Sequence, residues 1–480
     1  MKAMTKLAAV VWIGMAGALA AAAAPPTFNR DIAPILYKNC ATCHRPGEVA
    51  PFSLLTYQDA AKRAKQIATV TASRFMPPWK AEPGYGSFQN ERRLTDEQIA
   101  LLRDWAASGA PEGDAGAKPA PPEFVDGWRA GQPDRVFTLP EKFSLAADGP
   151  DQYRCFVIPM NLDHDVYVKA FEFRPENRRV VHHAIVYSDP TGASRKLAPN
   201  GSYPCFGGPG FAPTGLVGGW APGGSPNVTA KGMDLTVAKG TDLVLQIHYH
   251  PSGKPEQDQS SLGMTFGEAP TIGRGLILVN ASSINMPAGE SHYVVKTGIT
   301  IPEDVDVMSI TPHAHYLAKD MKIDARLPDG SVTHMIWIKD WDFNWQGNYR
   351  YSQPVKLPKG TRVELEYTYD NSAANPRNPS NPPVRVHFGE QTTDEMALAF
   401  LSVKLASLED EPKFQRLIGL EMIDEFLAHT DDPNNFPPEI SPATRAALAR
   451  AIALFDRNHD GKLDPEERKA LMDFLRARVQ

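Results

Sequence analysis

The spacing of hydrophobic residues changes twice along the chain, and each change predicts a change of secondary structure. Within residues 25–112 apolar side chains recur at helical intervals. The clearest helix begins at Thr95, where a capping-box sequence precedes Ile99, Leu102 and Trp105 on one apolar side. We therefore expect an α-helical N-terminal domain.

From residue 134 to residue 406 the pattern alternates with a period of two, which is typical of strands. In residues 241–249 one face is apolar, and its members are Leu243, Leu245, Ile247 and Tyr249. Residues 362–369 alternate in the same way. Strands bounded by Pro/Gly turns over so long a region favour two β-sandwiches over one, which we place at 134–268 and 269–406.

Helical patterning returns in residues 410–480, and a Pro/Gly/Ala-rich stretch over 113–133 is typical of a linker. The predicted fold is therefore multidomain. It has an all-β core of two jelly-roll-like sandwich domains, an α-helical domain before it and an α-helical tail after it.

The charged residues nearly balance, with 50 Lys and Arg against 56 Asp and Glu and a formal net charge of −6. A mildly acidic chain has no basic excess that would attract nucleic acid, so we expect no such partner.

Residues 1–24 have the parts of a cleavable signal peptide. Lys2 and Lys6 make the positive start, residues 7–20 the apolar centre, and residues 22–24 a small-residue cleavage site. An uncleaved anchor helix is the alternative, but the alanine-rich end favours cleavage. Because no later apolar run reaches the ~18 residues of a membrane helix, we expect a periplasmic or secreted protein with no membrane span in the mature chain.

Residues 40–44 read Cys-Ala-Thr-Cys-His, the attachment motif of haem c. Cys40 and Cys43 would form the two thioether bonds, and His44 would be the proximal iron ligand. Met76 is the predicted second axial ligand, because the two prolines after it would hold it in an extended loop. The alternative is that Met76 only packs in the core. A His/Met pair raises the haem potential and suits electron transfer.

The two remaining cysteines, Cys155 and Cys205, are predicted to form a disulfide, because the compartment is oxidising. The alternative is two unrelated thiols.

The β region contains three short histidine motifs and, later in the sequence, one methionine that could bind a metal with them. They are His182 and His183, then His248, then His313 and His315, and finally Met396. Imidazole and thioether without thiolate suit copper, because the soft sulfur favours Cu(I) and zinc rarely takes it. Taken singly, each pattern is more often an ordinary surface or core histidine.

Spacing restricts how these residues can meet. His313 and His315 are two apart, so on a strand both project from one face. His182 and His183 are adjacent, so binding one ion with both requires a bulge or a twist. His250 shares a face with His248 and could chelate a metal with it, although we rank it as a spare polar residue.

The order of these histidine and methionine motifs resembles that of the ascorbate-dependent type II copper monooxygenases, the family of peptidylglycine α-hydroxylating monooxygenase and dopamine β-monooxygenase. The resemblance covers about residues 134–405 and is close only around the motifs, above all at residues 245–249 and 393–396. It implies an electron-transfer copper held by His182, His183 and His248, and an oxygen-activating copper held by the catalytic set His313, His315 and Met396. It also implies two separate β-sandwich domains that face a solvent-filled cleft, and a supporting position for His387.

The departures from that family concern the substrate. Where the peptidylglycine branch has an arginine, an asparagine and a tyrosine that hold the substrate carboxylate, this chain has Thr311, Leu398 and Phe400. A buried carboxylate would lack its charged partner. We therefore expect a more apolar substrate.

Residues 456–467 fit the twelve-residue EF-hand loop, with Gly461 at the turn. The predicted calcium ligands are Asp456, Asn458, Asp460, the Lys462 carbonyl, Asp464 and Glu467. The alternative is an acidic helix-turn-helix without an ion.

Together these patterns predict a copper-dependent monooxygenase with two copper ions, haem c and calcium. It would hydroxylate a C–H bond of a small substrate with O2, drawing electrons from a small reductant or a periplasmic donor through the haem. The alternative is a periplasmic electron-transfer or copper-binding cytochrome that hydroxylates nothing. A third reading, structural zinc sites, fits Met396 poorly.

Overall fold

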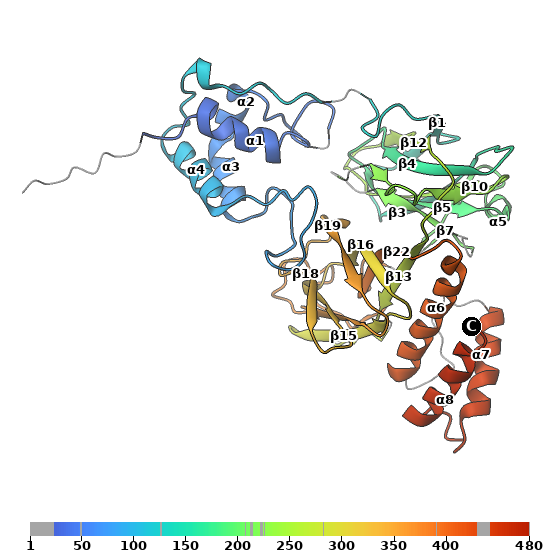
Figure 1. Ribbon diagram of the computed structural model, residues 1–480. Helices are drawn as coiled ribbons and strands as arrows, with labels where there is room; N and C mark the ends of the chain where they lie inside the picture. Colours follow the sequence, from blue (N-terminus) through green and yellow to red (C-terminus); the bar gives the residue numbers. More distant parts are fainter. Residues whose placement is uncertain are drawn as a thin grey trace, which may run out of the picture.

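The structure is a computed structural model of the chain (Figure 1). It describes residues 24–479 apart from 49, 125–126, 207, 212–214, 221–223, 225, 282, 390 and 430–441. All but the last residue of the predicted signal peptide lies outside the described residues.

Short helices packed around one apolar core form the N-terminal part. They are η1 (Phe28–Ile32), α1 (Ala33–Asn39), α2 (Tyr57–Ala61), α3 (Ala64–Ala72), α4 (Asp96–Ala107) and η2 (Ala115–Ala117). The capping box predicted at Thr95 is confirmed, since the Thr95 side chain accepts from the Gln98 backbone and the Gln98 side chain accepts from the Thr95 backbone. Leu102 and Trp105 are buried in this core, as their spacing predicts.

The first β region contains two five-stranded antiparallel sheets. One has the order β1 (Arg135–Thr138), β12 (Ser261–Phe266), β4 (Val166–Arg174) and β8 (Asn227–Val228), with β9 (Leu235–Val237) also paired to β4. The other has the order β6 (Ser202–Pro204), β3 (Gln152–Pro159), β10 (Asp242–Tyr249), β5 (Val181–Asp189) and β7 (Gly215–Trp220). A short pair, β2 (Phe143–Leu145) with β11 (Glu256–Asp258), and helix α5 (Ala193–Leu197) complete it. Side chains from both sheets share one core, to which β10 contributes its predicted apolar face.

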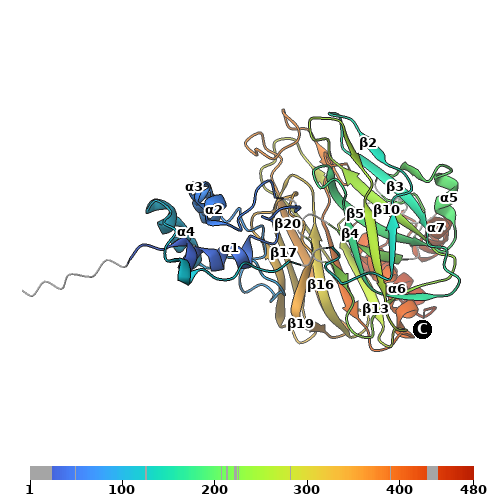
Figure 2. The same ribbon diagram turned by 90° about the horizontal axis from the view of Figure 1, so that it is seen from above.

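The second β region contains two four-stranded antiparallel sheets. One has the order β13 (Arg274–Asn280), β22 (Leu398–Lys404), β16 (Val305–His313) and β19 (Tyr349–Leu357). The other has the order β15 (Tyr293–Thr300), β20 (Arg362–Tyr369), β17 (Ala318–Arg326) and β18 (Val332–Ile338). A short pair joins β14 (Asn285–Met286) and β21 (Val386–His387). Seen from above, the two β regions lie together at one end of the molecule and the N-terminal helices at the other (Figure 2).

Segments from outside the β regions complete the second core. After α3 the chain leaves the helical part, and Ala81 and Phe88 are buried among residues of the second region. This loop forms isolated β-bridges from Ala81 to Ile338 and from Phe88 to Tyr351. From the other end of the chain, Phe414 of α6 (Asp410–His429) is buried in the same core.

The fold class predicted from the sequence is therefore wrong. The chain is not assembled from two jelly-roll-like sandwiches with a separate α-helical cytochrome c domain and a separate helical tail. Over the residues that the structure describes, it is a mostly β structure built around four main sheets, with few helices, and segments from both helical ends contribute to the second core. Local periodicity distinguishes strand from helix, but it carries no information about which distant surfaces pack together.

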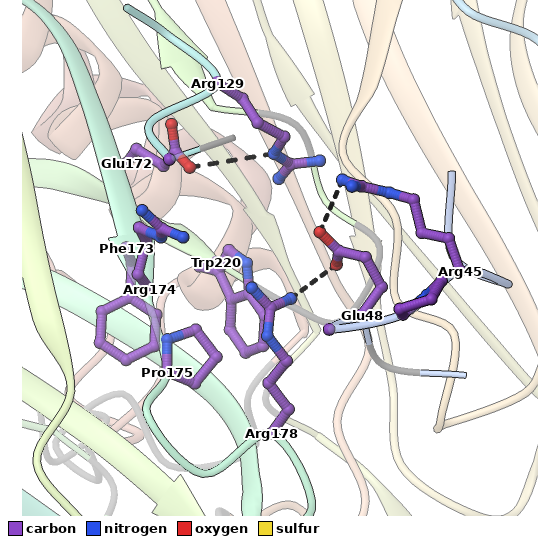
Figure 3. Close-up of a pocket in the computed structure, with 12 residues that line it drawn as sticks. Arg45, Glu48, Arg129, Glu172, Phe173, Arg174, Pro175, Arg178 and Trp220 are labelled. Atoms are coloured by element: carbon purple, nitrogen blue, oxygen red, sulfur yellow. Dashed lines mark hydrogen bonds and ion pairs between the residues drawn. The ribbon is translucent and has the colours of Figure 1, made fainter. Parts of the chain in front are cut away.

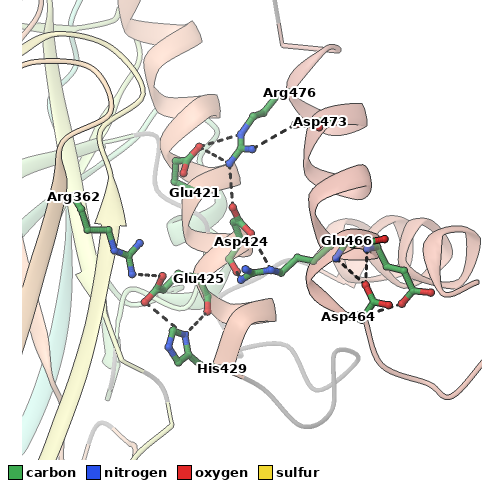
Figure 4. A network of polar contacts seen from close by, with 11 residues as sticks. Arg362, Glu421, Asp424, Glu425, His429, Asp464, Glu466, Asp473 and Arg476 are labelled. Atoms are coloured by element: carbon green, nitrogen blue, oxygen red, sulfur yellow. Dashed lines mark hydrogen bonds and ion pairs between the residues drawn. The ribbon is translucent and has the colours of Figure 1, made fainter. Parts of the chain in front are cut away.

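The C-terminal helices α6, α7 (Pro442–Phe455) and α8 (Pro465–Arg476) form a small apolar cluster of their own. A network of ion pairs reinforces it: Arg476 of α8 lies 2.9 Å from Glu421 and 3.1 Å from Asp424 of α6 (Figure 4). Glu425 of α6 in turn accepts from Arg362 of β20 at 2.6 Å. Among the described residues, no helix combines the length and apolar character needed to cross a membrane.

Candidate metal centres

Three of the predicted copper ligands meet on two neighbouring strands. The register of β5 and β10 sets His183 directly opposite His248. The Nδ1 atom of His183 lies 3.2 Å from Nδ1 of His182 and 3.4 Å from Nδ1 of His248. Among the described residues, this trio is the one group of His, Cys, Asp and Glu side chains whose ligand atoms all lie within 4.8 Å of one another.

The bulge that the adjacent histidines require is present. Along β10, His248 pairs with His183 but Tyr249 pairs with Val181, so His182 is an extra residue in β5. An extra residue re-aims the side chains on either side of it. This confirms the prediction that a bulge or twist brings His182 and His183 together.

The spacing of the trio suits a bound metal ion. Imidazole–metal bonds of ~2.0–2.1 Å in a tetrahedral arrangement separate the ligand nitrogens by ~3.3–3.4 Å. Burial lowers the pKa of His182 to about 4, and the pKa of His183 lies well below its usual value for the same reason. Both rings are therefore neutral at ordinary pH, which is the form that binds a metal.

A carboxylate that the sequence analysis missed supports the trio. The Nε2 atom of His248 donates to Oδ2 of Asp151 at 2.6 Å, so its Nδ1 is left to face the other two histidines. The second carboxylate oxygen accepts from Nδ1 of His250 at 2.7 Å. His250 is exposed and contacts Asp151 rather than joining the trio. Only the pairing of β3 with β10, which sets Gln152 opposite Tyr249, brings Asp151 to this position.

The second predicted set lies at the end of β16. His313 is the last residue of that strand, His315 follows two positions later, and their ring centroids are 5.3 Å apart. Nδ1 of His313 donates to Oε1 of Gln346 at 2.6 Å, and Nδ1 of His315 donates to the Asp394 carbonyl at 3.0 Å. These bonds fix both rings and assign Nε2 as the nitrogen that can bind a metal. Burial lowers the pKa of His315 to about 3.

Met396 belongs to the segment that packs against this pair. His313 pairs with Leu398 where the ladder of β16 and β22 ends, and Met396 lies two residues before Leu398, just beyond that end. Met396 is buried, and the segment before it bonds to the His315 ring.

The side chain of Glu395 fixes the backbone around His315. Its buried carboxyl group accepts from the backbone N–H groups of His315 at 2.8 Å and Leu317 at 2.5 Å. Burial raises the pKa of Glu395 to about 8, although these backbone donors favour the ionised form. The residue lies inside the motif that the sequence analysis singled out, but no role was predicted for it.

One aromatic ring lies between the two histidine sets. The ring of Phe343, which is buried, lies 5.7 Å from that of His182 and 5.8 Å from that of His315. It also packs on Tyr316 at 4.5 Å. The two sets therefore face each other across Phe343, where the family resemblance implies solvent.

His387 is exposed, and its contact with this region is made by its carbonyl, which accepts from the Glu395 backbone at 3.1 Å. Among the described contacts none joins its ring to His313 or His315. Its supporting role stays a prediction.

The haem motif is held in a form that suits the predicted attachment. Nδ1 of His44 donates to the Phe52 carbonyl at 3.2 Å, which leaves Nε2 as the possible iron ligand. Cys40 and Cys43 are not disulfide-bonded. Met76 follows α3, and its backbone N–H donates to Val70. Its role as an axial ligand stays a prediction.

Cys155 and Cys205 form the predicted disulfide, with an S–S distance of 2.08 Å. The bond joins β3 to the chain just after β6. It therefore supports the sheet that carries the histidine trio.

The predicted calcium loop connects α7 and α8. Gly461 has a positive φ of 82°, as the turn requires. Oδ1 of Asp456 is buried without a hydrogen-bond partner, and Oε1 of Glu467 accepts from the Arg457 backbone at 2.7 Å. An unpaired buried carboxylate oxygen at the first loop position suits an oxygen-liganded cation, so these residues fit the predicted calcium.

Comparison with known proteins leaves the family open. No protein-family model matches the chain, and no curated protein matches it. Solved structures do match, among them the crystal structure of PBSX exported protein XepA. That structure has 8% sequence identity and a TM-score of 0.16, over 60% of this chain and 92% of the other. A likeness so low carries no argument about fold or function.

Proposed function

We propose that the protein is a copper-dependent monooxygenase that hydroxylates a C–H bond of a small substrate. The observation that carries the proposal is the trio of imidazoles, which faces the pair His313 and His315 across Phe343. Met396, the proposed thioether ligand, follows closely on the segment that contacts His315. The overall reaction takes a C–H bond, O2, two electrons and two protons to an alcohol and water. Bound copper would supply the redox chemistry, namely activation of O2 and transfer of electrons.

The residues of the chain have separate tasks in this proposal. His182, His183 and His248 would hold the electron-transfer copper, with Asp151 orienting the His248 ring. At the oxygen-activating site the proposed ligands are His313, His315 and Met396. Gln346 and Glu395 would position the two histidines. Three protein ligands leave a coordination position open for O2 or substrate.

The surroundings of the second set favour an apolar substrate. Thr311 pairs with Phe400, and His313 pairs with Leu398, in the same stretch of β16 and β22. Since residues two apart on a strand share a face, Leu398 and Phe400 extend the face on which the metal ligands lie. A substrate carboxylate would find no cationic partner among these residues.

The N-terminal part offers a route for electrons. The loop after Met76 packs on the second β region, where the Trp79 ring lies 5.3 Å from that of Tyr349. Tyr349 pairs with Ile310 on β16, the strand that ends at His313. This contact supports an electron relay from the predicted haem to the copper sites. If the Met76→Ala protein, still carrying haem, reoxidised and hydroxylated as fast as the wild type after mixing with O2, the relay would be rejected.

Metal stoichiometry and product formation test the whole proposal. We expect two coppers per haem after copper loading, one in His248→Ala and one in Met396→Ala, and two in the control His164→Ala, whose ring is exposed. Hydroxylated product from a panel of apolar substrates should disappear in Met396→Ala. Zinc in place of copper, or no bound metal, would refute the proposal.

The second candidate is an electron-transfer or copper-binding cytochrome without hydroxylase activity. Phe343 favours it, because its ring occupies space between the two sets that a substrate would otherwise reach. Two coppers per haem without product from any substrate would support this candidate.

A further inference from the structure

A second feature of the molecule has no role in the proposed copper chemistry. A pocket of about 170 Å³, open to solvent, lies where the residues after the haem motif meet the first β region (Figure 3). Its lining comes from the loop Arg45–Glu48, from the segment around Arg129, from the end of β4 and the turn after it, and from Trp220 at the end of β7.

Positive charge dominates this pocket, with four arginines against two glutamates: Arg45, Arg129, Arg174 and Arg178 against Glu48 and Glu172. Glu48 bridges the two parts of the molecule, since it accepts from Arg45 at 2.8 Å and from Arg178 at 2.7 Å. Arg129 donates to the Gly224 carbonyl at 2.6 Å, but it lies 3.9 Å from the buried Glu172, beyond hydrogen-bond distance. The glutamates therefore do not satisfy the whole set of guanidinium groups.

One donor in the pocket is left unsatisfied. Nε of Arg45 is buried and has no hydrogen-bond partner. The Arg45 guanidinium also lies 4.0 Å from the centroid of the Phe124 ring, which fixes its position. In Figure 3 the guanidinium groups of Arg45 and Arg129 point toward one another. A buried unpaired donor and an excess of positive charge both favour an anion near these two groups.

The pocket lies beside the predicted haem attachment site. Arg45 follows His44 directly in the sequence. On the other side, Trp220 pairs with Ala184 on β5, next to His183.

From this geometry we infer that the pocket is an organic carboxylate site, with Arg45 and Arg129 as its principal ligands. The planar guanidinium group matches a carboxylate with two parallel hydrogen bonds, and Trp220, which also lines this mostly polar pocket, offers a ring against which the carbon chain of an organic acid could pack. Two sources supply this chemistry: the propionates of the predicted haem, or a free small organic acid. The first source depends on the haem of the proposed function, whereas the second does not.

Calorimetric titration of the full-length haem protein with succinate tests the free-acid source. Binding should weaken by about tenfold or more in Arg129→Gln and in Arg45→Gln. Arg103→Gln is the matched control, because Arg103 is an exposed arginine of the same helical part, paired only with its neighbour Asp104. Arg129→Gln leaves both bonds of Glu48 intact and so keeps the contact between the two parts of the molecule.

The haem midpoint potential, measured from pH 5 to 8, tests the propionate source. Propionates held by arginines stay ionised, so the wild-type potential should be flat over this range, as should that of Arg103→Gln. In Arg129→Gln the weaker partner raises the propionate pKa, so the potential should fall as pH rises.

The two measurements together decide whether the pocket binds a carboxylate and which one. Succinate binding that Arg129→Gln loses supports the free acid, and a new pH dependence without succinate binding supports the propionates. Absence of both, in an Arg129→Gln protein that melts at the wild-type temperature, overturns the site. Because neither measurement involves copper or product, failure here is distinct from failure of the proposed hydroxylase function.

Discussion

Replacing Asp151 should weaken copper binding at the histidine trio without unfolding the protein. Asp151 holds the His248 ring through a 2.6 Å hydrogen bond and touches no other ligand of the trio in the contacts described above. Asp151→Asn keeps the shape and an oxygen that can accept from Nε2, but it removes the negative charge. Asp151→Ala removes both the charge and the bond.

The size of the effect follows from this geometry. Losing an outer partner of a metal-bound histidine typically costs 10- to 100-fold in metal affinity, or about 1.4 to 2.7 kcal/mol. The Asp151 side chain is 20% exposed, so solvent partly screens its charge. We therefore expect copper affinity to fall about tenfold in Asp151→Asn, at the low end of that range. In Asp151→Ala, where the His248 ring is also free to rotate, it should fall by nearer 100-fold.

The assay is competition for Cu(I) against a coloured chelator, with the second site removed by Met396→Ala. Asp163→Asn is the matched control, because Asp163 makes the same kind of bond to His164 at 2.6 Å but is 91% exposed. It should bind copper as the wild type does. If Asp151→Ala also bound copper within about twofold of the wild type, the argument that Asp151 positions a metal ligand would be refuted.

Because protons and copper compete for the same nitrogen and the pKa of His182 is about 4, protonation of His182 should weaken copper binding at the trio as the pH falls below about 4, which a chelator titration would measure. Phe343→Leu should lower the free energy of unfolding by about 1–2 kcal/mol in denaturant titrations and change the magnetic coupling of two bound Cu(II) ions. Asp456→Ala should abolish any rise of the melting temperature with calcium, and an equal rise in this variant would exclude the loop as its cause. Replacing Cys155 and Cys205 by serine should cost about 4 kcal/mol of unfolding free energy, because the bond closes a loop over a separation of 50 residues, and an unchanged denaturant midpoint would contradict this.

Features that depend on neighbours in the chain were predictable from the sequence. The capping box at Thr95 and the alternating faces of β10 rest on the regular periods of helix and strand. The bulge at His182 could be predicted in the same way, since adjacent residues of a regular strand cannot share a face. The disulfide followed from the oxidising compartment and from there being only two candidate cysteines.

Features that depend on pairing between distant segments were not predictable. The fold class was wrong because periodicity does not show that the loop around Phe88 and helix α6 complete a core built by other strands. Asp151 and Phe343 likewise carry no local signal that would mark them as parts of the site. They reach the histidines through strand register and through packing between the two β regions. The sequence by itself therefore determined which residues have the chemistry of metal ligands, whereas only the tertiary structure decided which of them meet and what supports them, because contacts between distant segments leave no trace in local periodicity.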